Sequence, residues 1–198
     1  MDTAKYGLKT VSSVSELDRV YDFAQSILDV SQDTVHTREY YLAQVYRTPS
    51  LLIYAQREGK VVGCILASID EDHVLVGPTA VAEAERGQGI GRAMIRQLEA
   101  AAKRLNQTTL ILGARQEAEG FYARCGYRPN LFIQLPEVGQ ADRLKQLNTQ
   151  YPVVWESEEG KWTRLMLSTP QVDRELQLAY QAQFPNCHTQ YVFIKEIG

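Results

Sequence analysis

The sequence contains few cysteines, and their placement argues against two kinds of site. Cys64, Cys125 and Cys187 are the only three among 198 residues. They lie far apart, without the short spacing of metal ligands, and an odd number cannot pair completely into disulfides. We therefore expect reduced thiols, a cytoplasmic location and no bound metal.

Long apolar runs and basic patches are missing as well. The 21 Lys and Arg and 24 Asp and Glu give a net charge of −3, spread over the chain. No run approaches the roughly 20 apolar residues of a membrane span, and residues 1–5 lack the apolar core of a signal peptide. Neither nucleic acid nor a membrane is an expected partner.

The first half of the chain alternates between helix and strand patterns. Ser13 and Glu16 have the spacing of a capping box before a helix over residues 14–28. A second helix, capped by Thr34 or Thr37, ends before Pro49. The β-rich runs 51–56 and 61–68 predict a hairpin. A third strand over residues 73–82 contains Gly77-Pro78, where we expect a bulge.

A glycine-rich turn follows that third strand and precedes an amphipathic helix that ends near Asn106. Gly87, Gly89 and Gly91 permit positive φ and a close approach of the backbone to a ligand. Such a turn at a helix N-terminus favours a phosphate. It is not a P-loop, because Arg92-Ala93 replaces the required Lys and Ser or Thr. A dinucleotide fingerprint is excluded too, since its third small residue is absent.

The turn Arg86-Gly87-Gln88-Gly89-Ile90-Gly91 resembles the acyl-CoA loop of the GNAT superfamily of N-acetyltransferases. That signature is Gln or Arg, two residues, Gly, one residue, then Gly or Ala. A second motif of the family follows in the expected order, after a helix and a strand over 108–112. It consists of Ala118, Phe121, Tyr122, Gly126 and Tyr127. The resemblance covers roughly residues 5–136.

The resemblance implies an α/β fold with a mixed, mostly antiparallel sheet, two splayed parallel strands and flanking helices. Residues 1–136 would be the catalytic core. A hairpin over 151–168 and a helix from Thr169-Pro170 to about 183 would form a ββα lobe within 137–188, either inserted or C-terminal. Residues 189–198 would then be a final strand that pairs with the strand after the Phe-Tyr motif.

The resemblance also implies a reaction, in which an acetyl group passes from acetyl-CoA to a primary amine by direct attack in a ternary complex. The pantetheine arm would pair with exposed backbone groups, and the pyrophosphate would bind the glycine turn. Arg115 stands where many members have a cofactor-contacting Asn. The residues implied to bind acetyl-CoA are Val81, Ala82, Arg86, Gly87, Gln88, Gly89, Ile90, Gly91, Arg92 and Arg115.

Two catalytic roles follow from the same resemblance. Tyr122 would protonate the departing CoA thiolate, while Phe121 would face the core. The usual position of the base falls near Leu75, which cannot accept a proton. His73 lies two residues earlier on the same side of the strand and is our candidate base. Glu83 and Glu85 are alternatives, so the identity of the base stays open.

The acceptor amine is unknown. We expect its pocket to involve residues 33–38, the strand after the Phe-Tyr motif and the lobe. His36 is interpreted as a solvated loop histidine, with a substrate contact as the alternative. Two other functions stay open: a non-catalytic acyl-CoA sensor or interaction module, and transfer of a longer acyl group. A homodimer is possible.

Overall fold

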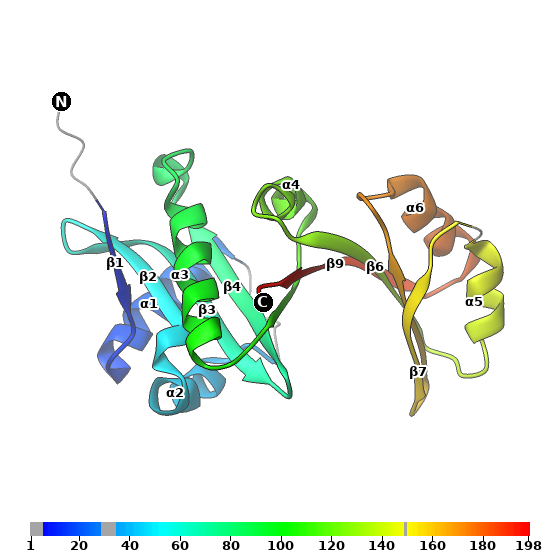
Figure 1. Cartoon of the computed structure of the whole chain (residues 1–198), viewed down its shortest axis with the longest axis horizontal. Coiled ribbons are helices and arrows are strands. Elements are labelled where there is room, and N and C mark those ends of the chain that lie inside the picture. Colours follow the sequence, from blue (N-terminus) through cyan, green and yellow to red (C-terminus); the bar gives the residue numbers. More distant parts are fainter. Residues whose placement is uncertain (1–5, 29–34, 149) are drawn as a thin grey trace. The chain divides into compact units, whose positions relative to one another are not determined.

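The computed structural model describes residues 6–28, 35–148 and 150–198 (Figure 1). It consists of two compact units, Met1–Ile111 with Glu196–Gly198, and Leu112–Lys195. Within the described residues, nine strands lie side by side in the order β1 (Gly7–Thr10), β2 (Leu52–Arg57), β3 (Lys60–Asp70), β4 (His73–Val81), β5 (Thr109–Gly113), β9 (His188–Glu196), β6 (Arg128–Leu135), β8 (Trp162–Ser168) and β7 (Val153–Glu159). The sheet is antiparallel apart from one parallel pair, β4 and β5. This confirms the predicted α/β fold class with a mixed sheet.

The first unit contains most of the predicted core. Its elements are β1 (Gly7–Thr10), α1 (Val14–Ile27), α2 (Arg38–Arg47), η1 (Pro49–Leu51), β2 (Leu52–Arg57), β3 (Lys60–Asp70), β4 (His73–Val81), η2 (Glu83–Glu85), α3 (Ile90–Arg104) and the start of β5 (Thr109–Gly113).

The caps of the first two helices follow the sequence closely. The hydroxyl of Ser13 accepts a hydrogen bond from the Glu16 N–H, as a capping box requires. The Glu16 carboxylate accepts from the N–H and hydroxyl of Ser12 rather than from Ser13, one residue before the expected donor. Helix α2 begins after Thr37, whose hydroxyl accepts from the Tyr40 N–H. Thr34, the other predicted cap, lies outside the described residues.

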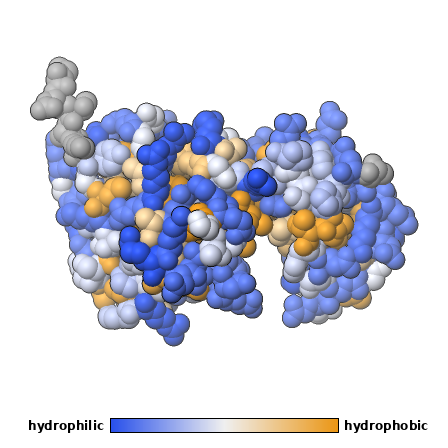
Figure 2. Space-filling view, in the orientation of Figure 1, coloured by the Kyte–Doolittle hydropathy of each residue, from blue (hydrophilic) through white to orange (hydrophobic). Residues whose placement is uncertain are grey.

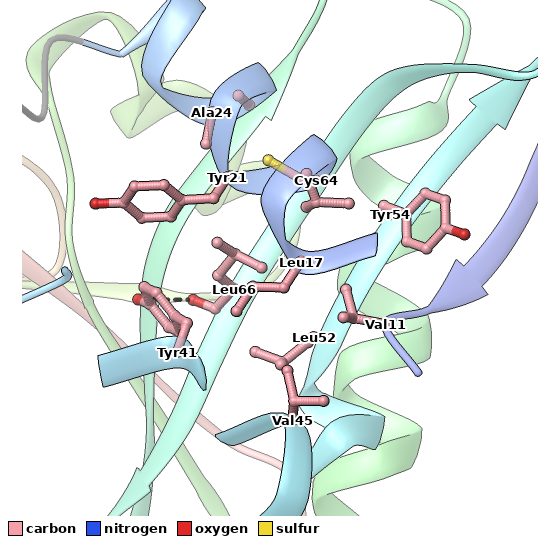
Figure 3. Packing of buried hydrophobic residues seen from close by; sticks show 12 residues of the cluster. Val11, Leu17, Tyr21, Ala24, Tyr41, Val45, Leu52, Tyr54, Cys64 and Leu66 are labelled. Atoms are coloured by element: carbon pink, nitrogen blue, oxygen red, sulfur yellow. Dashed lines mark hydrogen bonds between the residues drawn. The ribbon is translucent and has the colours of Figure 1, made fainter. Parts of the chain in front are cut away.

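Helices α1 and α2 cover one face of the sheet, and α3 covers the opposite face (Figure 1). The apolar side chains under α1 and α2 form one buried cluster (Figure 3). Its members are Val11, Leu17, Val20, Tyr21, Ala24, Tyr41, Val45, Leu52, Tyr54, Cys64, Leu66 and Ala80. Because side chains alternate between the two faces of a sheet, the cluster residues of β2 and β3 all lie on the face that α1 and α2 cover.

Helix α3 lies close to the sheet because β3 carries a glycine beneath it. A Cβ at Gly63 would lie 3.0 Å from the Met94 Cε atom and 3.2 Å from a methyl of Ile90. The fully buried residues of α3 are Ile90, Met94, Ile95, Leu98, Ala101 and Ala102. Ala93 and Leu105 are only half-buried. Asn106 adopts φ +58° and ends the helix as predicted.

The predicted bulge in β4 is present. Ile65 pairs with Thr79, and Ala67 pairs with Val76, so Gly77 and Pro78 together oppose Leu66. A proline here costs little, because the ladder is already interrupted at a bulge.

The second unit contains the Phe-Tyr motif and the C-terminal part of the chain. Besides the end of β5, its elements are η3 (Gln116–Ala118), α4 (Glu119–Arg124), β6 (Arg128–Leu135), α5 (Ala141–Leu147), β7 (Val153–Glu159), β8 (Trp162–Ser168), α6 (Arg174–Gln183) and β9 (His188–Glu196). Strand β9 pairs with β6 from Arg128↔Ile194 to Gln134↔His188, as expected for the final strand.

The C-terminal segment differs from the expected ββα lobe in two ways. Helix α5 precedes the hairpin, and the sequence analysis missed it because seven residues are too few for a clear helical period. The hairpin also extends a sheet, since β8 pairs with β6 over six residue pairs. The two compact units therefore have limits other than the predicted core and lobe.

The surface is largely polar, with apolar areas over the strands of the second unit (Figure 2). Strand β7 exposes Val153, Val154 and Trp155. In the described part of the chain, every helix is too short or too polar to cross a bilayer.

Candidate functional site

The glycine turn connects β4 to α3 and has the backbone conformation that its glycines suggest. Gly87 adopts φ +78° and Gly89 adopts φ +82°, and Gly89 is the N-cap of α3. Gly91 lies in the first helical turn. A Cβ at Gly87 or Gly89 would meet no atom within 4 Å. The glycines are therefore required by φ and not by packing, and the space above the turn is open to a ligand.

The same turn offers hydrogen-bond donors to that space. The N–H groups of Glu85 and Arg86 are already bonded to the carbonyls of Ala82 and Glu83. The N–H groups at the start of α3 have no acceptor inside the helix, and they carry the positive end of the helix dipole. An anion such as a pyrophosphate fits this arrangement.

Strand β4 presents backbone groups beside the turn. The Ala82 N–H donates to the Val62 carbonyl at 2.9 Å, so its expected availability to a ligand is wrong. Because antiparallel ladders alternate, the backbone groups of Val81 and Thr79 point away from β3. The Val81 carbonyl accepts from the Arg86 Nε at 3.2 Å. Of the predicted pair, Val81 therefore keeps its N–H for a ligand.

The parallel pairing of β4 and β5 is short. Within the described residues, its register covers two pairs, Val74↔Leu110 and Leu75↔Ile111. Strand β4 continues for six more residues, as far as Val81. Its later backbone groups on this side are therefore not paired with β5, which agrees with the expected splaying of two parallel strands.

The predicted arginines occupy different places. Arg86 is exposed beside the turn and bonds Val81, as described above. Arg92 is exposed in the first helical turn of α3, which places its positive charge near the glycine turn. Arg115 is the N-cap of η3 and belongs to the second unit.

The candidate bases are not gathered at the turn. His73 is the first residue of β4, and its Nδ1 lies 3.3 Å from the Asp72 carboxylate. Val81 lies eight positions further along the strand, about 26 Å away at the usual rise of a strand. Glu83 is exposed in η2, whereas the Glu85 carboxylate is engaged by Arg57 at 2.7 Å.

The bulge in β4 lies against a buried polar cluster that the sequence analysis did not assemble. Tyr41 is fully buried, and its hydroxyl donates to the Leu66 carbonyl at 3.3 Å (Figure 3). The same hydroxyl lies 2.8 Å from the His36 Nδ1. The Tyr21 hydroxyl donates to the His36 carbonyl. His36 is therefore held in the fold, and its interpretation as a solvated loop histidine is wrong. The Gly77-Pro78 pair was the sequence feature that marked this part of β4 as irregular.

In the second unit, Tyr122 is the deeper residue of the Phe-Tyr pair. It is 6% exposed, and its ring lies 5.1, 5.9 and 6.1 Å from those of Phe121, Tyr127 and Phe193. Phe121 is only half-buried, which corrects the expectation that it faces the core. It is the next residue of α4, Tyr122, that is buried and packs against Phe193 of β9.

Two of the three thiols, Cys64 and Cys187, lie where burial disfavours the thiolate. Burial raises the pKa of Cys64 to about 12 and that of Cys187 to about 11, because a thiolate is poorly solvated there. Among the residues that the structure describes, no three His, Cys, Asp or Glu side chains gather into a possible metal site.

Solved structures with a similar fold are acetyltransferases. Diaminobutyrate acetyltransferase EctA from Paenibacillus lautus, solved with L-2,4-diaminobutyric acid and coenzyme A, is 14% identical with a TM-score of 0.52, over 86% of this chain and 98% of that chain. Ard1 from Thermoplasma volcanium is 17% identical with a TM-score of 0.51, over 85% of this chain and 99% of that chain. The ribosomal-protein-S18-alanine N-acetyltransferase from Escherichia coli is 15% identical with a TM-score of 0.50, over 85% and 96%.

These identities establish similarity of fold alone. Among curated protein sequences no match is found. The model of the acetyltransferase (GNAT) family matches residues 17–127, more than half of the chain, and this range includes both the glycine turn and the Phe-Tyr motif. Members of this family take an acyl group from acetyl-CoA. The chain therefore belongs to the GNAT acetyltransferase family and is an acyltransferase.

Proposed function

We propose that this protein transfers an acetyl group from acetyl-CoA to a primary amine by direct attack in a ternary complex. The observation that carries the proposal is the glycine turn. Gly87 and Gly89 hold positive φ beneath open space, at the N-terminus of a 15-residue helix. This arrangement is suited to the pyrophosphate of CoA.

The pantetheine arm would extend from the turn along β4 like an added strand. Thr79 and Val81 direct their backbone groups to that side, away from β3. One of these N–H groups would donate to the thioester oxygen as it gains negative charge, which lowers the barrier to attack. Arg86 and Arg92 would pair with phosphate charge.

The acceptor must attack as a neutral amine. At a reference pKa of about 10.4, removal of its proton at pH 7 costs roughly 4 to 5 kcal/mol, so a base or a water relay is needed. His73, Glu83 and Glu85 remain the predicted bases, although Glu85 is engaged by Arg57.

Collapse of the tetrahedral intermediate would release CoA as a thiolate. We assign Tyr122 as the acid that protonates this sulfur, because a phenol with a reference pKa near 10 holds its proton at neutral pH. The assignment rests on the resemblance of the Phe-Tyr motif and on the presence of both motifs within the matched family range.

An acceptor screen tests the function. Release of the CoA thiol from acetyl-CoA would be measured with polyamines, amino acids, aminoglycosides and N-terminal peptides. We expect turnover with at least one primary amine and none with its N-acetylated form. CoA binding without turnover on any class would instead favour a non-catalytic acyl-CoA-binding module.

A further inference from the structure

The glycine turn is attached to the neighbouring hairpin by a closed ring of three side chains. The Arg57 Nη1 lies 2.7 Å from the Glu85 Oε2, and the Arg57 Nη2 donates to the Gln88 Oε1 at 2.9 Å. The ring closes where the Gln88 Nε2 donates to the same Glu85 oxygen at 3.2 Å. All three residues belong to the first unit.

The position of Gln88 in the chain makes this ring relevant to the turn. Gln88 lies between Gly87 and Gly89, the two residues with positive φ. Glycines on both sides leave this backbone with many accessible conformations, which a flexible loop must lose when it binds a ligand. The Gln88 side chain bonds this part of the turn to Arg57, Glu85 and the Ala84 carbonyl, in addition to the bond of Arg86 to the Val81 carbonyl.

The Arg57–Glu85 ion pair of the ring is better shielded from solvent than an ordinary surface ion pair, whereas Gln88 is exposed. The side chains of Arg57 and Glu85 are 19% and 17% exposed. Arg57 is the last residue of β2, next to the two-residue turn at Glu58 and Gly59, both with positive φ. Its guanidinium is planar and binds a carboxylate and an amide oxygen with two terminal nitrogens at once. The hairpin therefore offers a rigid base for the turn.

We propose that Arg57, Glu85 and Gln88 are positioning residues that hold the glycine turn in its phosphate-binding conformation before CoA arrives. The identity of CoA as the ligand rests on the proposed function, whereas the ordering of the turn by the three side chains does not depend on it. A Cβ at Gly87 or Gly89, on either side of Gln88, would meet no atom within 4 Å, so the space beside the held turn is open to the ligand. A turn ordered in advance loses less conformational entropy on binding.

The experiment compares Gln88→Leu and Arg57→Met with Lys60→Met. Lys60 is exposed on the same hairpin and serves as the control for loss of a cation. Order parameters of the backbone ¹⁵N nuclei of residues 87–91 would be measured without ligand. We expect values near 0.85, typical of rigid backbone, in the wild type and the control, and values falling toward about 0.6 in both ring variants. Unchanged values in the ring variants would overturn the proposal.

Calorimetric titration with CoA gives the second readout. We expect both ring variants to bind CoA about tenfold more weakly, because their turn then loses its conformational entropy when CoA binds. The melting temperature without ligand should change little. The double variant should be no weaker than the weaker single one, since either change opens the same ring. A lowered melting temperature with unchanged CoA affinity would mean a purely structural ring. Absence of CoA binding by the wild type would refute the proposed function, while the order parameters would still decide whether the ring holds the turn.

Discussion

Tyr122 shows what one hydroxyl group contributes in the proposed reaction. Its ring is buried against Phe121, Tyr127 and Phe193, so Tyr122→Phe keeps the packing and removes only the proton donor. We expect turnover to fall by roughly ten to ten-thousandfold, the range that general acids supply. CoA affinity should stay unchanged, which calorimetric titration would check.

The neighbouring ring supplies the control for this prediction. Phe121→Leu alters packing beside Tyr122 without touching a hydroxyl group. If Phe121→Leu lowered turnover as much as Tyr122→Phe, the loss of turnover would come from packing and not from the hydroxyl group. If Tyr122→Phe kept wild-type turnover, Tyr122 would not be the proton donor.

Among the elements, β4 depends on the glycine of its bulge. A Cβ at Gly77 would overlap the Tyr41 hydroxyl and lie 2.9 Å from the His36 Nδ1 and 3.0 Å from the Leu66 carbonyl. We expect Gly77→Ala to lower the free energy of unfolding by about 1 to 3 kcal/mol, as overpacking usually does. Denaturation in urea would measure the change.

Two further variants separate this clash from a general effect of alanine. Gly7→Ala adds a methyl where no atom lies within 4 Å, so it should leave stability almost unaltered. Tyr41→Phe removes the atom that the new methyl would overlap. The Gly77→Ala and Tyr41→Phe losses should therefore sum to more than the loss in the double variant, and strict additivity would refute the clash.

The start of α1 should respond to pH. Hydrogen bonds from the Ser12 hydroxyl and N–H lower the pKa of Glu16 below its ordinary value of 4.5. A carboxylate with a lowered pKa in the folded state stabilises the protein above its unfolded pKa, and this stabilisation is lost as the pH falls through the folded pKa.

Glu16→Gln should therefore reduce the free energy of unfolding by about 1 kcal/mol at pH 7. The difference from the wild type should narrow as the pH falls below 4.5 and close once the native carboxylate is protonated. Urea denaturation over a pH series would show this. Glu175→Gln, an exposed change in the first turn of α6, is the matched control for loss of one charge. A difference that persists unchanged to low pH would contradict the account.

At the scale of the whole molecule, the features predicted from the sequence are those encoded locally. The glycine turn, the bulge at Gly77-Pro78 and the cap at Thr37 each depend on residue types within a few positions. The fold class followed because two such local motifs stood in the order of one family.

The features that were missed depend on contacts between distant residues. Arg57 and Gln88 are separated by 31 positions, and Tyr41 and Leu66 by 25, so no local pattern brings either pair together. Helix α5 is seven residues long. It is held by a buried hydrogen bond from the Tyr180 hydroxyl to the carbonyl of Leu144 in α5, and these two residues are 36 positions apart. Tertiary packing, not local propensity, decides such elements.

Melting of the protein with and without CoA tests the central claim, that the glycine turn binds the CoA pyrophosphate. At about a hundred times its dissociation constant, a ligand of the folded state adds roughly 2.7 kcal/mol of stability. For a chain of this length that raises the melting temperature by about 5 to 10 °C. Gly89→Val should abolish the shift, whereas Gly139→Val, also at positive φ and without neighbours within 4 Å, should keep it. A wild-type melting temperature unmoved by millimolar CoA and acetyl-CoA would contradict the claim.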